Sequence, residues 1–480
     1  MKIIISLIVT LFLSASDILS QDFNLKIEPY VFEDSEGEKI DAELGTFTVP
    51  ENREKTGGKQ INLNFVRFKS TSPNPGYPII YLAGGPGGSG IQTARGSRFD
   101  LFMKMRGIGD VIAFDQRGTG MSDGLPAYNG YYLVDLSQVM TEESAEKAIA
   151  EEVVKMEKYF EAEGHDLSGY NSRESAHDIN DLRKALGAEK MNIWGISYGS
   201  HLALTTLKEH DDQVHKMIIA GVEGYDHTVK LPSDQQELLE KIDQLLKDNP
   251  ETRKLYPDFL GDLEKLLRKV DENPVYIKTK NPLAGELMEM QLGKLDLQML
   301  FAWYLGGPDN FKDLPLHVKQ MLEGNFSAIE DVAIYTRAGR LSGMSIGMDV
   351  ASGISPERRR RIKKEAGETL LGDAINFPYL IQQKALSHLD LGDSFREPFV
   401  SDVPVFCISG TLDGRTSVKN ADFTLETLKN GHHLVIEGAG HSDPLFLSSP
   451  KIGELMIDFM NGENIGVQRI TLAPMKFDLE

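Results

Sequence analysis

The chain has 480 residues, of which 41% are hydrophobic and 26% are charged, a composition that indicates a folded globular protein. It excludes disordered, collagen-like, coiled-coil and disulfide-scaffold classes. Acidic residues outnumber basic ones by 72 to 51, and the net charge of −21 disfavours nucleic acid as a partner because it repels phosphate backbones. The single cysteine, Cys407, lies in an apolar run, which predicts a buried side chain and excludes an internal disulfide or a multi-cysteine metal site.

The N-terminal segment has the pattern of a secretory signal peptide. Lys2 precedes an apolar run at residues 3–13, and small and polar residues follow it. The run is shorter than the roughly 20 apolar residues that a membrane-spanning helix requires. We expect cleavage after Ser20, which makes residues 1–20 the signal peptide; cleavage after Ser16 and an uncleaved helix packed on the body are alternatives. No cysteine stands at the end of the run, so no lipid anchor is predicted, and we expect a secreted or periplasmic protein.

Beyond this segment, apolar runs that end in glycine or polar turns alternate with helical patterns. A helix is predicted over residues 141–163, where apolar residues recur at helical spacing until Gly164, and another over residues 175–186. Alternating strands and helices favour a mostly parallel sheet covered by helices on both faces. The predicted strands are residues 61–68, 78–83, 110–114, 190–194, 216–221, 403–409 and 433–437.

The block of residues 228–397 differs, because it is rich in helical patterns and poor in strand runs. One of its predicted helices starts at Ser355, with Pro356 in the first turn. We interpret the block as a large helical lid inserted between two strands of the sheet, since no flexible linker flanks it; an independent second domain is the alternative. The predicted α/β core is therefore split into residues 21–227 and 398–480.

A candidate nucleophile lies in the sequence Gly195-Ile196-Ser197-Tyr198-Gly199, a G-x-S-x-G motif. The motif alone is weak, but here a predicted strand precedes it and a helical run at residues 201–207 follows it. The sharp strand-to-helix turn needs glycine, and it lifts the serine hydroxyl above the end of the sheet at a helix N-terminus. We therefore predict Ser197 as the nucleophile of an α/β-hydrolase fold.

A serine nucleophile needs a base and an orienting carboxylate, and in α/β-hydrolases the chain order is serine, acid, histidine. Asp413 follows the apolar run at residues 403–409, and His441 follows the run at residues 433–437. Both stand where strands are expected to end, and we predict Asp413 as the acid and His441 as the base. Asp443 is a weaker candidate for the acid because it comes after the histidine.

Two further loops follow the early strands. The glycine-rich segment 83–90 is where an oxyanion loop is expected, and we predict the backbone N–H groups of Gly85 and Tyr198 as the oxyanion donors. A phosphate loop is excluded, because neither the P-loop nor the Rossmann spacing is present. After the next strand, Asp115 and Arg117 are predicted to form a buried pair with a structural role.

Five motifs occur together along the chain: GGPGGSG, DQRGTGMS, GISYGS, SGTLDGRT and GAGHSD. As a set they resemble the prolyl aminopeptidase and tripeptidyl aminopeptidase group of α/β-hydrolases, over residues 49–473. The resemblance implies serine exopeptidase chemistry on peptides with a free N-terminus, with Ser197, Asp413 and His441 as nucleophile, acid and base. It also implies that acidic residues bind the α-ammonium group of the substrate. The candidates here are Glu223, which directly follows a predicted strand, and then Asp226, Asp349 and Glu365.

The sequence thus predicts a secreted serine aminopeptidase that releases N-terminal amino acids, of the proline type, or short peptides through an acyl-enzyme, with no metal or organic cofactor. Ala83 stands where prolyl aminopeptidases typically have histidine, which fits the tripeptidyl branch better. An esterase or lactonase on the same scaffold is the first alternative, because a fold does not determine its substrate. The second is a non-catalytic binding protein, although the complete set of Ser197, Asp413 and His441 argues against it. The oligomeric state stays open.

Overall fold

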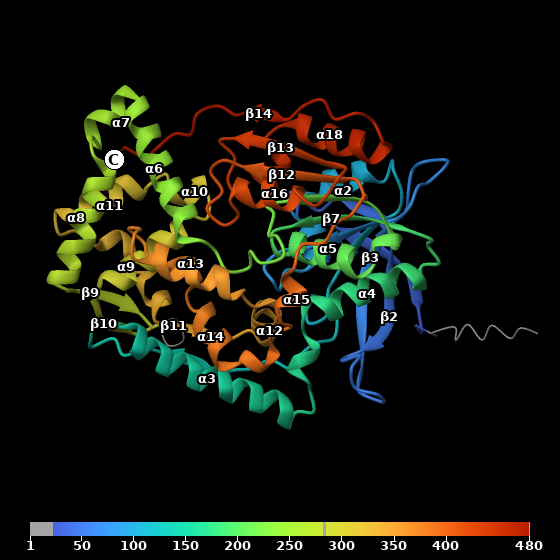
Figure 1. Cartoon of the computed structure of the whole chain (residues 1–480), viewed down its shortest axis with the longest axis horizontal. Coiled ribbons are helices and arrows are strands. Elements are labelled where there is room, and N and C mark those ends of the chain that lie inside the picture. The colour runs from blue at the N-terminus through green and yellow to red at the C-terminus, as the bar shows by residue number, and fades with distance from the viewer. Residues whose placement is uncertain (1–22, 282–284, 480) are drawn as a thin grey trace, which may run out of the picture.

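The computed structural model describes residues 23–281 and 285–479, and its centre is a ten-stranded sheet (Figure 1). The predicted signal peptide at residues 1–20 lies outside the described residues. Neighbouring strands are parallel from β5 to β14, whereas β1, β2 and β3 pair antiparallel, so the predicted mostly parallel sheet is confirmed. In sheet order the strands are β1 (Lys26–Glu33), β2 (Lys39–Pro50), β3 (Gln60–Phe68), β5 (Val111–Phe114), β4 (Ile79–Leu82), β7 (Met191–Ile196), β8 (Val214–Ala220), β12 (Val405–Gly410), β13 (Gly431–Glu437) and β14 (Arg469–Thr471).

Helices cover both faces of the sheet, so its central strands are apolar on both sides. In β7, Ile193 packs toward α4 and α5, whereas Trp194 packs toward α1, α2 and α18 on the other face. Burial on both faces makes such a strand a continuous apolar run, which is why the sequence predicts it. Strand β1, at one edge of the sheet, and its neighbour β2 are half-exposed, and the sequence analysis did not predict them. The covering helices are α1 (Gly90–Arg95), α2 (Phe99–Met105), α4 (Ser172–Ala185), α5 (Tyr198–Glu209) and α18 (Pro450–Asn461).

Between β8 and β12 the chain leaves the sheet and forms the insertion (Figure 1). Its main hydrophobic core includes Leu239, Leu263 and Phe301, which are fully buried. The insertion also contains a β-hairpin and a third short strand, which the predicted helical block did not include. Its helices are α6 (Pro232–Asp248), α7 (Pro250–Leu255), α8 (Phe259–Glu272), α9 (Lys294–Tyr304), α10 (Pro308–Phe311), α11 (Leu314–Leu322), α12 (Gly343–Ser352), α13 (Pro356–Ala366), α14 (Tyr379–Ala385) and α15 (Asp393–Arg396), and its strands are β9 (Val275–Lys280), β10 (Leu287–Leu292) and β11 (Ala338–Arg340).

The lid also contains elements that precede the insertion in the sequence. The apolar face of α3 (Glu142–Ala162) packs against Val350 and Leu386 of the insertion instead of the sheet. Beside it, β6 (Tyr131–Leu133) pairs with β11. The helix predicted at residues 141–163 is therefore present, but it belongs to the lid and not to the first core segment. Helical periodicity shows that a face is buried without showing which element covers it.

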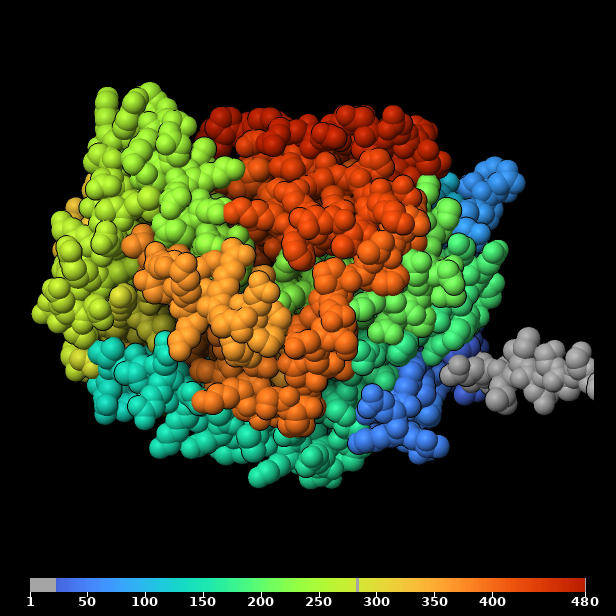
Figure 2. All heavy atoms as spheres, in the orientation of Figure 1, coloured from blue at the N-terminus to red at the C-terminus, as the bar shows by residue number. Residues whose placement is uncertain are grey.

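The insertion and the core form one continuous surface in the space-filling view (Figure 2). The insertion, yellow-green to light orange, forms the left side and much of the front, where it contacts the C-terminal part of the core, drawn in orange-red. In the described part of the chain, no helix combines the length and the apolar character that crossing a bilayer requires.

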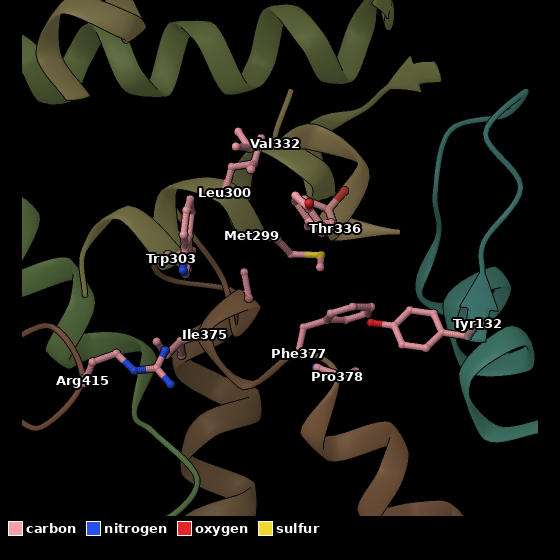
Figure 3. A pocket seen from close by; sticks show the side chains of 13 residues that line it. Tyr132, Met299, Leu300, Trp303, Val332, Thr336, Ile375, Phe377, Pro378 and Arg415 are labelled. Carbon is pink, nitrogen blue, oxygen red and sulfur yellow. The ribbon is translucent and has the colours of Figure 1, made fainter. Parts of the chain in front are cut away.

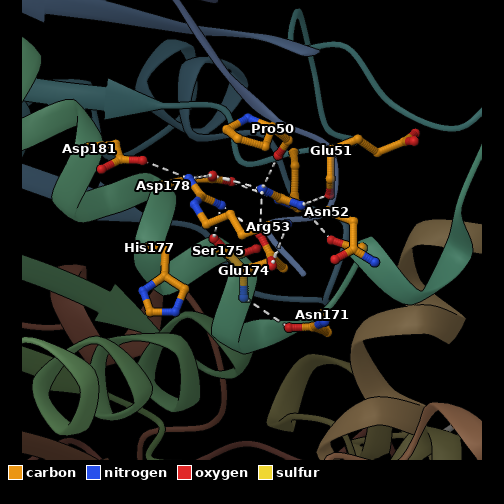
Figure 4. A network of polar contacts seen from close by, with 12 residues as sticks. Pro50, Glu51, Asn52, Arg53, Asn171, Glu174, Ser175, His177, Asp178 and Asp181 are labelled. Carbon is orange, nitrogen blue, oxygen red and sulfur yellow. Dashed lines mark hydrogen bonds and ion pairs between the residues drawn. The ribbon is translucent and has the colours of Figure 1, made fainter. Parts of the chain in front are cut away.

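A buried ion-pair network joins the end of β2 to α4 (Figure 4). Arg117 is fully buried, and its guanidinium donates to both carboxylate oxygens of Asp178 at 2.7 Å. Arg53 shares Asp178 and also binds Glu174 and Asp181, at 2.6 and 2.7 Å. The network therefore fixes the position of the loop after β5, which carries Arg117, relative to the end of β2 and to α4.

The predicted pair between Asp115 and Arg117 is wrong. Asp115 instead accepts hydrogen bonds from the Ser89 hydroxyl at 2.5 Å and from the N–H groups of Ile91 and Met121 at 3.1 and 2.8 Å. Asp115 thus fastens the glycine-rich loop after β4 to the loop after β5. Proximity in the sequence indicated the wrong partner because the carboxylate that neutralises Arg117 comes from a distant helix.

Candidate active site

Ser197 lies at the junction of β7 and α5, on the turn that the G-x-S-x-G motif predicts. Its φ of 55° and ψ of −128° are unusual for a residue with a side chain, and such strain is frequent at functional sites. Backbone atoms lie very close to the glycines on both sides of Ser197. A Cβ atom at Gly199 would lie 2.2 Å from the Leu82 carbonyl oxygen, and one at Gly195 would lie 2.5 Å from the Gly199 carbonyl oxygen. Only glycine fits these positions, and the resulting turn places Ser197 at the carboxyl end of β7.

Asp413 follows β12 and contacts His441, which follows β13. Nδ1 of His441 lies 2.7 Å from Oδ2 of Asp413. Asp413 is buried, and it accepts further hydrogen bonds from the Thr416 hydroxyl at 2.6 Å and from the N–H groups of Arg415 and Thr416, both at 2.8 Å. Burial alone would raise the pKa of Asp413, but His441 and the Thr416 hydrogen bonds outweigh it and lower the pKa. The carboxylate stays ionised and holds the imidazole ring in place.

Ser197 and His441 line the same cavity of about 530 Å³. The wall of this cavity also includes Gly85, Glu223 and Arg415. The structure therefore brings a serine, a histidine and, behind the histidine, the carboxylate of Asp413 to the carboxyl ends of three parallel strands. This is the arrangement that nucleophilic acyl transfer by serine requires.

Two backbone N–H groups beside the serine have no hydrogen-bond acceptor among the described residues. They belong to Tyr198, the first residue of α5, and to Gly85, whose φ is 124°. The glycine-rich loop comes so near the nucleophile that a Cβ atom at Gly84 would lie 2.9 Å from Cβ of Ser197. Unpaired donors beside a serine are what an oxyanion hole needs.

Glu223, the first candidate for an ammonium-binding residue, is buried in the wall of the cavity that holds Ser197. Its Oε1 atom forms an ion pair with Lys230, which also donates to the His227 carbonyl at 3.1 Å. No partner for Oε2 occurs among the described residues. Glu223 thus offers one unpaired carboxylate oxygen to the cavity. Sequence reasoning missed Lys230, because no motif marks a lysine seven residues after the candidate.

Asp349 is the other candidate whose carboxyl group has no partner among the described residues, and it does not line the cavity that holds Ser197. It lies on α12, and its side chain makes no hydrogen bond or ion pair with any described residue. Desolvation, followed by the nearby Glu223 carboxylate, raises the pKa of Asp349 to about 8. Glu223 therefore lies near enough to Asp349 for its charge to act on that carboxyl group. By contrast, Asp226 and Glu365 are both engaged in hydrogen bonds within the lid.

The rival acid, Asp443, is occupied by another partner: the Arg98 guanidinium binds its Oδ1 atom at 2.8 Å. Sequence reasoning also missed Thr416 and Arg415, which lie within three residues of Asp413 in the same turn. Their position directly after the predicted acid was the available signal. Arg415 is exposed, and its guanidinium has no hydrogen-bond or ion-pair partner among the described residues.

Residues 77–261 match the family described as alpha/beta hydrolase fold. The chain is 31% identical over 191 residues to the tripeptidyl aminopeptidase of Streptomyces coelicolor, an alignment that covers 38% of this chain and 35% of that protein. It is 29% identical over 192 residues to serine protease Hip1 of Mycobacterium bovis, with 37% and 35% covered. It is 28% identical over 150 residues to proline iminopeptidase of Xylella fastidiosa, with 31% and 34% covered.

The alignments span about one third of the length of each of these curated relatives. Together with the family match, they confirm the resemblance that the five motifs indicate. The chain therefore has the α/β-hydrolase fold, as the sequence predicts.

Proposed function

We propose that this α/β-hydrolase is a serine aminopeptidase, which removes one amino acid or a short peptide from the free N-terminus of a peptide. The observation that carries this proposal is the buried carboxylate of Glu223, which lines the cavity that holds Ser197 and His441. An esterase for neutral substrates has no use for a carboxylate at this place, whereas a peptide N-terminus carries a positive charge that a carboxylate binds. The tripeptidyl aminopeptidase and proline iminopeptidase among the relatives support the same activity.

The catalytic steps follow from the positions of the three triad residues. His441 accepts the proton of the Ser197 hydroxyl as its oxygen attacks the carbonyl carbon of the scissile bond. The N–H groups of Gly85 and Tyr198 bind the negatively charged oxygen of the tetrahedral intermediate. His441 then gives the proton to the departing amine, and Asp413 stabilises the positively charged ring between these two transfers. A water molecule, activated by His441 in the same way, releases the acyl group from Ser197.

The substrate ammonium group is bound by Glu223 and Asp349. Glu223 shares its charge with Lys230, so its remaining oxygen offers only part of a full negative charge. Asp349 supplies the remaining negative charge. Because its pKa is raised to about 8, it holds a proton at neutral pH until a cation arrives. Binding of the ammonium group favours the ionised form of Asp349, so the site acquires its charge together with the substrate. Because Glu223 is already paired with Lys230, this arrangement avoids an unpaired charged carboxylate at Asp349 before the substrate binds.

The test is a set of initial rates on paired chromogenic substrates. The set contains free and N-acetylated Pro- and Ala-p-nitroanilide, Ala-Ala-Pro-p-nitroanilide and a p-nitrophenyl ester. We expect turnover of the free-amine anilides and a loss of about 10- to 100-fold on acetylation, because the ammonium–carboxylate interaction is lost. The ratio of the one-residue to the three-residue substrate distinguishes release of single amino acids from release of tripeptides. Ester turnover with every anilide inert would overturn the aminopeptidase proposal.

The assignment of the nucleophile has its own test. A fluorophosphonate probe should label the wild-type protein and fail to label Ser197→Ala. Ser137→Ala, which changes an exposed serine that does not line the cavity of Ser197, is the matched control and should be labelled like the wild type. Labelling of Ser197→Ala would show that another residue is the nucleophile. Absence of labelling in all three proteins would favour the non-catalytic binding protein.

We also propose that the protein is exported, on the basis of the apolar run behind Lys2. Expression of the full chain in a bacterial host, followed by N-terminal sequencing of the periplasmic fraction, tests this proposal. A mature protein that starts at Gln21 supports it, and an uncleaved protein that stays in the cytoplasm contradicts it.

A further inference from the structure

A second cavity, of about 410 Å³, lies inside the lid (Figure 3). Apolar and aromatic side chains form most of its wall, and two of them, Trp303 and Tyr335, remain 56% and 62% exposed. Large aromatic side chains that stay exposed at a concave surface are typical of ligand sites. Arg415 is the one charged residue that lines this cavity in the described part of the chain. Figure 3 shows its guanidinium reaching toward the cavity from the side opposite Tyr132.

Arg415 joins this cavity to the active site. It also lines the cavity that holds Ser197. A third hollow, of about 500 Å³, is lined by His441, Arg415 and Trp303, and the last two of these also line the lid cavity. The three cavities therefore adjoin one another, from the serine past the histidine to the aromatic interior of the lid.

The proposed role of His441 determines which part of the substrate lies along these adjoining cavities. In the proposed mechanism His441 protonates the departing amine, so the residue after the scissile bond must lie beside His441. The cavity lined by His441, Arg415 and Trp303 adjoins this position. The N-terminal side of the substrate is bound elsewhere, at Glu223 and Asp349. The lid cavity therefore lies on the side of the leaving group.

We propose that the lid cavity binds the apolar side chain of a C-terminal residue, while Arg415 pairs with the free carboxylate of that residue. This inference rests on the proposed aminopeptidase function and narrows its substrates to short peptides that end one residue after the cleaved bond. A guanidinium binds a carboxylate through two parallel hydrogen bonds, which a neutral amide cannot reproduce. The side chain of an exposed arginine is ordinarily only solvated, but the backbone of Arg415 is held in a fixed position. Its N–H donates to Asp413 at 2.8 Å, and Gly414 before it is so close to the carbonyl of Leu305 that no other residue fits there.

The experiment compares four peptides on the same enzyme preparation. The acyl group that gives the fastest anilide turnover is joined to Phe or to Gly, each as the free acid and as the amide. For the wild type we expect kcat/KM to be about tenfold higher for the Phe acid than for the Phe amide, because only the acid carries the charge that Arg415 binds. We also expect the Phe acid to be preferred over the Gly acid, because only phenylalanine fills the aromatic cavity.

Three variants assign these preferences to residues. In Arg415→Gln the ratio of acid to amide should fall to about one, and in Arg415→Lys it should be partly kept. Arg360→Gln, which changes another exposed arginine on α13, is the matched control and should keep the full ratio. In Trp303→Ala the preference for Phe over Gly should fall, while the ratio of acid to amide is kept. A variant with reduced stability still reports its ratios, because each ratio is measured on one preparation.

Failure of this inference can be told apart from failure of the proposed function. If the anilides are cleaved but the wild type shows equal rates for acid and amide, only the inference about Arg415 is overturned. The same holds if Arg415→Gln keeps the tenfold ratio. If neither anilides nor peptides are cleaved while the ester is, the aminopeptidase function and this inference are both overturned.

Discussion

The hydroxyl of Thr416 and the ring of His441 share one oxygen atom of Asp413, at 2.6 and 2.7 Å. The hydroxyl also lies 3.3 Å from the same ring nitrogen that contacts Asp413. Three side chains from two strand ends are thus fixed around one buried oxygen. Thr416 is 1% exposed and does not line the cavity of Ser197, so it acts as a positioning residue and not as a binding residue.

Thr416→Val should therefore lower kcat and leave KM nearly unchanged. A hydrogen bond to a charged group is worth about 1.5 to 3 kcal/mol, and a fraction of that free energy corresponds to a loss of about tenfold in kcat. Thr416→Ser, which keeps the hydroxyl, should retain most of the wild-type kcat. Steady-state kinetics on the best anilide measures both parameters. A fall in stability with unchanged kcat in Thr416→Val would show that the hydroxyl serves folding alone.

Gly221→Ala should impair catalysis through His441. Gly221 has φ of 54°, and a Cβ atom there would lie 3.0 Å from Cε1 of the histidine ring, so the ring must move. The backbone conformation itself costs a residue with a side chain about 1 to 2 kcal/mol. Gly57→Ala is the matched control, because Gly57 has φ of 72° but no atom within 4 Å of the added methyl group. Thermal unfolding should show destabilisation in both variants, whereas kcat should fall only in Gly221→Ala.

The stabilising effect of Asp349→Asn on the folded protein should increase as the pH rises. The native pKa of Asp349, about 8, lies above the usual aspartate value of 3.8, so between these pH values the native state holds a proton that the unfolded state has released. Wild-type stability therefore falls from about pH 4 to about pH 8 through this group and is constant above. The asparagine variant lacks this effect. The difference in Tm between variant and wild type, measured from pH 5 to pH 9, should rise and then level off; a constant difference would contradict the raised pKa.

Asp178→Asn should be strongly destabilising. The substitution removes a fully buried carboxylate that neutralises Arg117 and Arg53 together (Figure 4). Breaking a buried ion pair typically costs 3 to 5 kcal/mol, because the remaining charge stays in a medium of low polarity. Urea unfolding measures this loss. Glu33→Gln, which breaks the exposed pair with Lys39, is the control and should cost less than about 1 kcal/mol. Equal effects of the two substitutions would contradict the role of the network.

Much of the core could be predicted because its signals are local. The strand before Ser197 is apolar on both faces, and the turn after it needs glycine on both sides of the serine, so a short segment predicts both the fold and the candidate nucleophile. The same reasoning applies to Asp413 and His441, which follow apolar runs directly. The strands β1 and β2 were missed because a half-exposed strand lacks a continuous apolar run.

The partners of charged side chains could not be predicted. Arg117 was expected to pair with Asp115, two residues away, yet it binds Asp178 on a helix that is distant in the sequence. Likewise, Glu223 was identified as a candidate because it directly follows a predicted strand, but its pairing with Lys230 emerged only from the folded chain. An ion pair depends on which loops and helices meet in space, and single-sequence patterns carry no information about that.

By itself the sequence determined the parallel sheet, the strand-to-helix turn that carries Ser197, and the chain order of serine, acid and histidine. Each of these depends on local backbone geometry and on the alternation of apolar residues, which neighbouring residues encode. Only the tertiary structure decided that α3 belongs to the lid, that the charge of Glu223 acts on Asp349, and that Arg415 lines both the cavity of Ser197 and the aromatic cavity of the lid. These relationships join segments far apart in the chain, and they arise from packing between surfaces whose pairing no local pattern specifies.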